Sequence, residues 1–125
     1  MKQILISAAI SGMLAVALGA FGAHVLKKII TPDMLEIYKT GVQYHFYHTF
    51  ALLATGILLH LKPSKSLKTA AYLFMAGIVL FSGSLYALAF TGIKVLGIIT
   101  PFGGVAWLIA WLLLVIHFSK YTRTK

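Results

Sequence analysis

The feature that most constrains this chain is a set of four long segments without any charged side chain. They cover residues 3–26, 40–61, 69–93 and 95–119, and all eleven Lys and Arg residues and both acids fall between or outside them. An α-helix needs about 20 mostly apolar residues to cross the roughly 30 Å hydrocarbon core of a bilayer, and each segment is long enough. The pattern predicts an all-α integral membrane protein. We expect a single transmembrane domain over residues 1–125, with spans at about 4–26, 40–61, 69–91 and 101–119.

The composition agrees with a membrane protein and excludes several other classes. Hydrophobic residues make up 60% of the chain and charged residues 10%, unlike a soluble domain. The absence of cysteine excludes disulfides and thiolate metal sites. A net charge of +9 is compatible with nucleic-acid binding, but the cations occur in short runs at the span ends, where lysines meet lipid head groups. The bilayer is therefore the expected partner, and nucleic acid is not.

The basic residues also predict the orientation in the membrane. One side holds seven of them (Lys2, Lys62, Lys65, Lys68, Lys120, Arg123 and Lys125), and the other side holds four (Lys27, Lys28, Lys39 and Lys94). Because basic residues concentrate in cytoplasmic loops, we expect a multi-pass protein with both termini in the cytoplasm. The apolar run continues past the weak cleavage-like sequence Ala20-Phe21-Gly22, so we expect the first span to be retained.

Small residues predict how the helices pack, because close packing drives helix association in lipid. Stripes at three- and four-residue steps occur in the first three spans, and they predict a four-helix bundle. They comprise Ala8, Gly12, Ala15, Gly19 and Gly22; then Gly41, Tyr44, His48, Ala51 and Thr55; then Gly77, Phe81, Ser84, Leu88 and Thr91. Phe46, Phe50, Leu53 and Ile57 are expected to face lipid.

A weak internal repeat suggests that the bundle consists of two parallel helical hairpins. Residues 17–26 align with 87–96, and Ile29-Ile30-Thr31-Pro32 aligns with Ile98-Ile99-Thr100-Pro101. Each half would end an outward-going helix with glycine and begin the next at Thr-Pro, where threonine caps and proline starts a helix. Chance matches are common in apolar sequence, so the repeat stays an open alternative.

Polar side chains near the outer ends of the spans form the candidate site. A polar side chain in hydrocarbon needs a partner, so several at one depth indicate a site. Tyr44 and His48 lie four residues apart on the packing stripe, with His45 nearer its edge. The candidate ligand-binding residues are His24, Tyr44, His48, Ser82, Ser84, Tyr86 and Thr100. Three alternatives remain: an interfacial belt of Tyr and His, a purely structural hydrogen-bond network, and serines bonded to their own helix.

Other kinds of site have weaker signals. His45 and His48 have a spacing that suits two metal ligands, but no third ligand stands nearby, so no metal is expected. Haem is an alternative, with axial histidines drawn from an outer set (His24, His45 and His48) and an inner set (His60 and His117). No nucleophile, base and orienting residue form a catalytic set, so we expect no enzyme.

Four motifs resemble the DUF423 family, also called UPF0382, to which transmembrane protein 256 is similar. They are Gly19-Ala20-Phe21-Gly22-Ala23-His24, Tyr44-x-x-Tyr47-His48, Phe81-Ser82-Gly83-Ser84-Leu85-Tyr86 and Thr100-Pro101-x-Gly103-Gly104. Val25, His45 and Ala110 depart from the pattern, which has Gly, Gln and Gly at these positions. The resemblance implies a small bacterial plasma-membrane protein with four helices, and it implies no particular activity.

Together these observations favour a non-enzymatic membrane protein with an outer-leaflet pocket of His, Tyr and Ser residues. The pocket would bind a small molecule or a lipid, or would form an assembly interface in a homo-oligomer. The two alternatives are a redox protein with histidine-ligated haem and a facilitator for a small solute, which needs a continuous polar path past Ser7 or His60.

Overall fold

The computed structural model describes residues 2–123, with side chains described for residues 2–120, and this part of the chain consists of helices joined by short turns. The first helix is α1 (Lys2–His24), followed by the short 3-10 turn η1 (Leu26–Lys28) and the long helix α2 (Pro32–Leu61). The third rod runs without a break through α3 (Lys65–Gly77), η2 (Ile78–Ser82) and α4 (Gly83–Thr91). A second 3-10 turn, η3 (Lys94–Ile98), leads into α5 (Thr100–Arg123).

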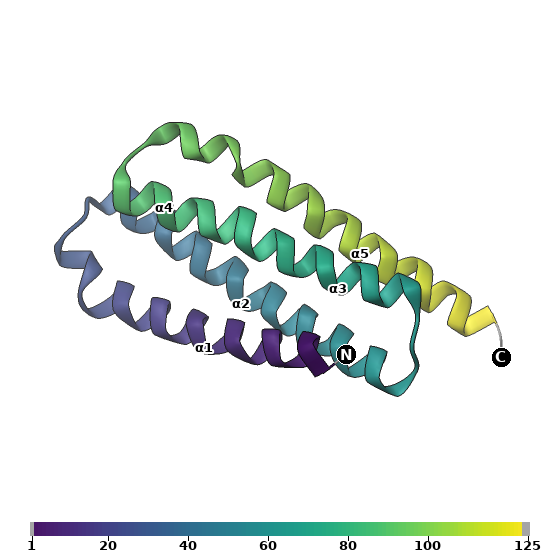
Figure 1. Cartoon of the computed structure of the whole chain (residues 1–125). Helices are drawn as coiled ribbons and strands as arrows, with labels where there is room; N and C mark the ends of the chain where they lie inside the picture. Colours follow the sequence, from purple (N-terminus) through teal and green to yellow (C-terminus); the bar gives the residue numbers. More distant parts are fainter. Residues whose placement is uncertain (1, 124–125) are drawn as a thin grey trace.

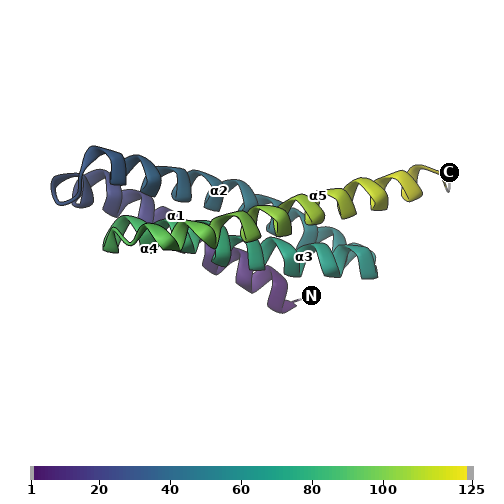
Figure 2. The same cartoon turned by 90° about the horizontal axis from the view of Figure 1, so that it is seen from above.

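The four rods run up and down as antiparallel neighbours, as Figure 1 shows. Helix α2 contacts α1 on one side and the α3–η2–α4 rod on the other, and that rod contacts α5. The N- and C-terminal ends lie at the same end of the bundle, together with the turn between α2 and α3 (Figures 1 and 2). We call this the terminal end, and the end that holds η1 and η3 the far end.

Three of the rods are long and apolar enough to cross a membrane: Lys2–Lys28, Lys65–Thr91 and Lys94–Lys120. Helix α2 has 30 residues, but it carries Gln43, Tyr44, His45, Tyr47 and His48, which lower its hydropathy. At a rise of 1.5 Å per residue it is about 45 Å long, well beyond the roughly 30 Å of hydrocarbon. The chain therefore forms an all-helical bundle in which three helices are long and apolar enough to cross a membrane, and the fourth span remains a prediction.

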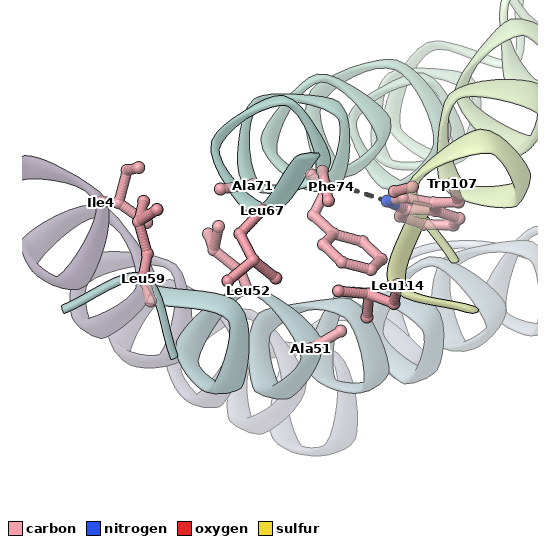
Figure 3. Packing of buried hydrophobic residues seen from close by; sticks show 12 residues of the cluster. Ile4, Ala51, Leu52, Leu59, Leu67, Ala71, Phe74, Trp107 and Leu114 are labelled. Carbon is pink, nitrogen blue, oxygen red and sulfur yellow. Dashed lines mark hydrogen bonds between the residues drawn. The ribbon is translucent and has the colours of Figure 1, made fainter. Parts of the chain in front are cut away.

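The main core lies toward the terminal end, between α2, α3 and α5, with Ile4 and Ala8 of α1 at its margin (Figure 3). Phe74 is fully buried, and the Trp107 indole beside it donates a hydrogen bond to the Phe74 carbonyl over 3.1 Å. Gly77 makes room for this indole, since a Cβ there would overlap the ring. Gly103 plays the same part where α5 meets the backbone of Phe81. Two glycines thus set how closely α5 approaches the third rod.

A smaller core closes the far end around Tyr38, which is 1% exposed and packs with Leu26 and Ala89. The Tyr38 hydroxyl donates to the Leu18 carbonyl of α1, and the ring lies against Gly22, where a Cβ would overlap it. The far-end core therefore ties the start of α2 to both neighbouring rods.

The sequence predicts the start of α2 correctly, but the expected glycine endings hold for only one half. Thr31 caps α2, since its hydroxyl accepts from the Met34 N–H over 3.3 Å, and Pro32 is the first helical residue. Gly92 ends α4 with a φ of 71°, a left-handed conformation suited to glycine. In the first half α1 continues through Gly22 to His24, so no glycine ends it. The repeat is not confirmed.

The third rod contains a π-helical segment that the sequence does not predict. Residues Ile78–Ser82 form a π-helical segment, in which the Gly83 N–H donates to the Ile78 carbonyl five residues back. One extra residue in the turn rotates everything that follows relative to α3, and such segments often accompany functional sites. The segment faces α2 and α5, next to the polar residues described below.

Candidate functional site

A chain of polar side chains crosses from α1 through α2 to α4, with His45 at its centre. His45 Nε2 lies 2.9 Å from the Ser11 hydroxyl, and His45 Nδ1 lies 2.8 Å from the Tyr86 hydroxyl. The Ser11 hydroxyl also lies 2.6 Å from that of Thr49, one turn after His45. His45 is 4% exposed and Thr49 is 3% exposed. The chain thus joins three helices through side chains that are buried or half-buried.

One end of this chain forms the floor of a groove. The groove runs between α1 and the third rod over α2, and its volume is about 270 Å³. Its polar residues are Ser7, Ser11 and His45, and its apolar lining is Ile10, Leu14, Leu52, Met75, Ile78 and Val79. Ile10, Leu14 and Val79 are largely exposed, so the groove opens on the outer surface of the bundle. It contains no charged side chain.

The second histidine of α2 lies on the side that faces α5. His48 stacks on Trp107 with the ring centres 3.6 Å apart and the planes 4° from parallel. The Trp111 indole N–H donates to His48 Nε2 over 3.2 Å, and His48 Nδ1 lies 2.9 Å from the Tyr44 carbonyl. Since an indole N–H only donates and a carbonyl only accepts, His48 must be neutral and carry its proton on Nδ1. Both ring nitrogens are then fully used.

The structure reverses the predicted roles of Tyr44 and His45. Tyr44 was expected to point into the bundle, yet it is 39% exposed and lies over Trp107 and Phe81 at the surface. His45, expected nearer the edge of the stripe, is the more buried of the two. The reason is that α2 packs against α1 as well as the third rod, which moves the centre of its buried face toward His45. The burial of His48 and the exposure of Phe50, Leu53 and Ile57 on the surface of the bundle agree with the prediction, while Phe46 is half-buried.

The predicted serines and threonine lie in the interior but bind in pairs of their own. Ser82 donates to the Gly41 carbonyl of α2 over 2.8 Å, so it links two rods instead of bonding to its own helix. Ser84 donates to its own helix at Phe81 and lies 2.5 Å from the Thr100 hydroxyl. Of the predicted residues, Tyr86 alone joins the His45 chain directly.

His24 is not part of this cluster. It is exposed at the end of α1, and its Nδ1 lies 2.9 Å from the Ala20 carbonyl of its own helix. It lies thirteen residues beyond Ser11, or about 20 Å along the helix. The polar residues therefore do not share one depth at the far end, as the sequence suggested, because His45 contacts the middle of α1.

Sequence reasoning missed four residues of these two clusters: Ser11, Thr49, Trp107 and Trp111. Ser11 follows Ala8 by three positions and precedes Ala15 by four, so its place on the small-residue stripe was a usable signal. The two tryptophans had no such signal, because their partners are glycines and a histidine on other helices. No group of three or more His, Asp or Glu side chains comes together as a metal site within residues 2–123.

Comparisons with known proteins place the chain in a family. The model of the DUF423 family, described as a protein of unknown function, matches residues 18–104. The UPF0382 membrane protein YwdK of Bacillus subtilis (strain 168) is 50% identical over 122 residues, which cover 97% of this chain and 99% of that protein. The UPF0382 membrane protein SAB0533 of Staphylococcus aureus (strain bovine RF122 / ET3-1) is 44% identical, with 97% and 98% covered. The UPF0382 inner membrane protein YgdD of Escherichia coli (strain K12) is 41% identical, with 98% and 93% covered.

No solved structure matches the chain. The relatives are bacterial and are named membrane or inner membrane proteins, in agreement with the three helices that are long and apolar enough to cross a membrane. The match to the family model and the near-complete coverage of these relatives establish that this chain belongs to the DUF423 (UPF0382) family of membrane proteins.

Proposed function

We propose that this protein crosses the bacterial plasma membrane four times and binds a small uncharged amphipathic molecule in the groove between α1 and the third rod. The observation that carries the proposal is the buried Ser11–His45–Tyr86 chain, which meets an apolar groove on the outer surface of the bundle. An intramembrane ionisable residue indicates a functional site by default. Ser11, His45 and Tyr86 are joined by hydrogen bonds, but no carboxylate stands beside His45 to stabilise the imidazolium that would form if it took the serine proton, because both acids of the chain, Asp33 and Glu36, lie at least nine residues before it. We therefore propose binding without catalysis.

The lining and the volume of the groove favour a small, uncharged occupant. No cation lines it that would stabilise a phosphate, and no acid lines it that would stabilise an amine. Its volume of about 270 Å³ lies near the lower limit of ligand pockets, roughly 300–1,000 Å³. That space suits one ring or a compact head group. A hydrocarbon tail would continue over the exposed side chains of Ile10, Leu14 and Val79 into the lipid.

The fourth span is part of the same proposal. The polar groups that lower the hydropathy of α2 include His45, His48 and Thr49, all of which are buried in the bundle instead of facing lipid. With four spans both termini lie on one side, as the terminal end of the bundle requires. The seven basic residues on this side favour the cytoplasm.

The absence of native cysteine allows this topology to be tested with single cysteines. In intact cells, a membrane-impermeant maleimide should label Lys94→Cys at the far end and leave Ser66→Cys near the terminal end unlabelled until the cells are broken. The opposite pattern would show that the termini lie outside the cell. Equal labelling of both sites in intact cells would contradict the proposed topology, in which the two ends of the bundle lie on opposite sides of the membrane.

Haem and solute passage receive less support from the geometry. Both ring nitrogens of His48 and of His45 are bonded to protein atoms, and each would have to lose a partner to ligate iron. The His45 chain runs across the bundle from α1 to α4, whereas a solute path must run along it. A Soret band in protein purified from its own membrane would restore the haem alternative.

The proposed function is tested by native mass spectrometry of the protein released gently from its own membrane. We expect a discrete extra mass on the wild type that is lost in Leu14→Trp, which fills the groove. The matched control is Leu108→Trp, which changes an exposed leucine of α5 outside the groove. A wild-type spectrum without any adduct, or an adduct retained equally by both variants, would contradict groove binding. The same spectra count subunits, which tests the possible homo-oligomer.

A further inference from the structure

The His45 chain contains more protons than its own hydrogen bonds use. Ser11, Thr49 and Tyr86 each carry one hydroxyl proton, and a neutral His45 carries one ring proton. These four protons serve three bonds: Ser11 with Thr49, Ser11 with His45, and His45 with Tyr86. One proton is therefore left without an acceptor inside the chain.

Burial decides which hydroxyl carries the spare proton. A spare proton on Thr49 would be sealed in the interior without a partner, because that residue is 3% exposed. Tyr86 is only partly buried, but it does not line the groove, and its hydroxyl has no hydrogen-bond partner besides His45 among the described residues, so a spare proton there would also lack an acceptor. One arrangement leaves no spare proton on either Thr49 or Tyr86. In it, the Thr49 hydroxyl and His45 Nε2–H both donate to Ser11, and the Tyr86 hydroxyl donates to His45 Nδ1. Ser11 then accepts twice, and its own O–H is free toward the groove that it lines.

Ser7 supplies a second free donor in the same groove. It lies one helical turn before Ser11, so both hydroxyls occupy the same face of α1, about 6 Å apart along the helix. Ser7 lines the groove, and its hydroxyl makes no hydrogen bond within residues 2–123. The apolar groove thus presents two spare hydroxyl protons and no charge.

From these two donors we propose that the occupant of the groove is a quinone: an uncharged ring with two carbonyl oxygens and a hydrocarbon tail. This inference rests on the proposed function and deepens it by naming the ligand class. Two carbonyl oxygens accept from Ser7 and Ser11 and bring no proton of their own, whereas an alcohol adds a further donor to a site that already has two. Leu52, Met75 and Ile78 supply the apolar walls for the ring.

The binding test uses the intact protein in nanodiscs of phosphatidylcholine, with a decyl-substituted 1,4-benzoquinone as the probe. We expect saturable binding and a lowered carbonyl stretching frequency in the infrared spectrum of the ¹³C-carbonyl probe. Ser7→Ala and Ser11→Ala should each weaken binding by roughly threefold to tenfold, the effect of one neutral hydrogen bond. The matched control is Ser84→Ala, which removes a serine hydroxyl bonded to Thr100 outside the groove and should leave affinity unchanged. If Ser11→Ala fails to fold, Ser7→Ala decides, because the Ser7 hydroxyl has no hydrogen-bond partner among the residues that the structure describes.

The outcomes separate the quinone inference from the proposed function. If decylbenzene, which lacks carbonyls, binds as tightly as the quinone and Ser7→Ala has no effect, the groove binds ligands but the quinone inference is overturned. The inference is also overturned if the quinone binds but Ser7→Ala and Ser11→Ala behave like Ser84→Ala. If neither probe binds and the native protein carries no adduct, both the inference and the proposed function fail.

The proton count has a test that needs no ligand. In ¹⁵N-histidine NMR spectra of the reconstituted protein, His45 should carry its proton on Nε2. His48 serves as the internal reference, since Trp111 and the Tyr44 carbonyl require its proton on Nδ1. A His45 proton on Nδ1 would move the spare proton away from Ser11 and overturn the assignment.

Discussion

His45 and His48 lie three residues apart on one helix, and the partners around them differ in kind. The partners of His48 are fixed in role: an indole that only donates, a carbonyl that only accepts, and a stacked Trp107 ring. The partners of His45 are hydroxyls, which rotate and either donate or accept. The difference teaches that two buried histidines on one helix can differ in whether their hydrogen-bond partners have fixed roles. His48 packs α2 against Trp107 and Trp111 of α5, whereas His45 lies beside an open groove.

The largest expected loss of stability comes from disturbing Trp107, the ring stacked on His48, by a substitution at Gly77. Gly77→Ala places a Cβ on the Trp107 indole, which is 4% exposed and also bonds to the Phe74 carbonyl. We expect the free energy of unfolding to fall by about 1–3 kcal/mol, the usual effect of overpacking. Unfolding in mixed detergent micelles, followed by circular dichroism, measures the change.

The control for this substitution is Gly12 of α1, which faces Thr49 of the His45 chain. At Gly12 a Cβ would meet Thr49 Cγ2 at 3.6 Å, an ordinary contact. Gly12→Ala should therefore be neutral, or stabilising by up to about 1 kcal/mol through helix propensity. Equal losses in the two variants would show that the fit of Trp107 against Gly77 is not what holds α5.

A smaller effect is expected from removing one hydroxyl of the His45 chain. Tyr86→Phe keeps the ring and leaves His45 Nδ1 without a partner. We expect the free energy of unfolding to fall by about 0.6 kcal/mol, the average for hydrogen bonds between membrane helices, and by no more than about 1.7 kcal/mol, the largest value for such bonds. Tyr44→Phe is the matched change beside His48, because the Tyr44 hydroxyl bonds to no group within residues 2–123. Its stability should change by no more than a few tenths of a kcal/mol. A larger loss for Tyr44→Phe than for Tyr86→Phe would reverse the ranking of the two tyrosines.

The comparison also shows which features of the fold and of the site can be predicted from the sequence. The charge-free segments predict the rods, and the Thr31-Pro32 pair predicts the first residue of α2, because these signals are local. The small-residue stripe of α1 is likewise visible and includes Ser11. The choice between Tyr44 and His45 is not local. Consecutive helix positions differ by about 100°, and the buried centre depends on where two neighbouring rods pack.

The remaining features depend on contacts between distant parts of the chain. The π-helical turn at Ile78–Ser82 has no signature in its own residues, yet it changes the direction in which everything after it faces. Trp107 and Gly77 are conspicuous in the sequence, but only the packed bundle shows that one fills the space left by the other. The groove could not be predicted from the sequence either, because it forms only where two rods pack against each other.

The smallest expected effect is at His24, which tests whether the far-end histidine belongs to either cluster. His24→Ala removes an exposed ring bonded to its own helix, so stability should change by less than about 0.5 kcal/mol and the adduct in native spectra should persist. His45→Ala is the matched histidine truncation, and it should lower both stability and adduct retention, because it leaves Ser11 and Tyr86 without their common partner. Loss of the adduct in His24→Ala would place the binding site at the far end, about 20 Å from Ser11, and would favour the pocket first expected from the sequence over the groove. Retention in His24→Ala together with loss in His45→Ala would locate the ligand on the His45 side of α2, where the two free serine hydroxyls lie.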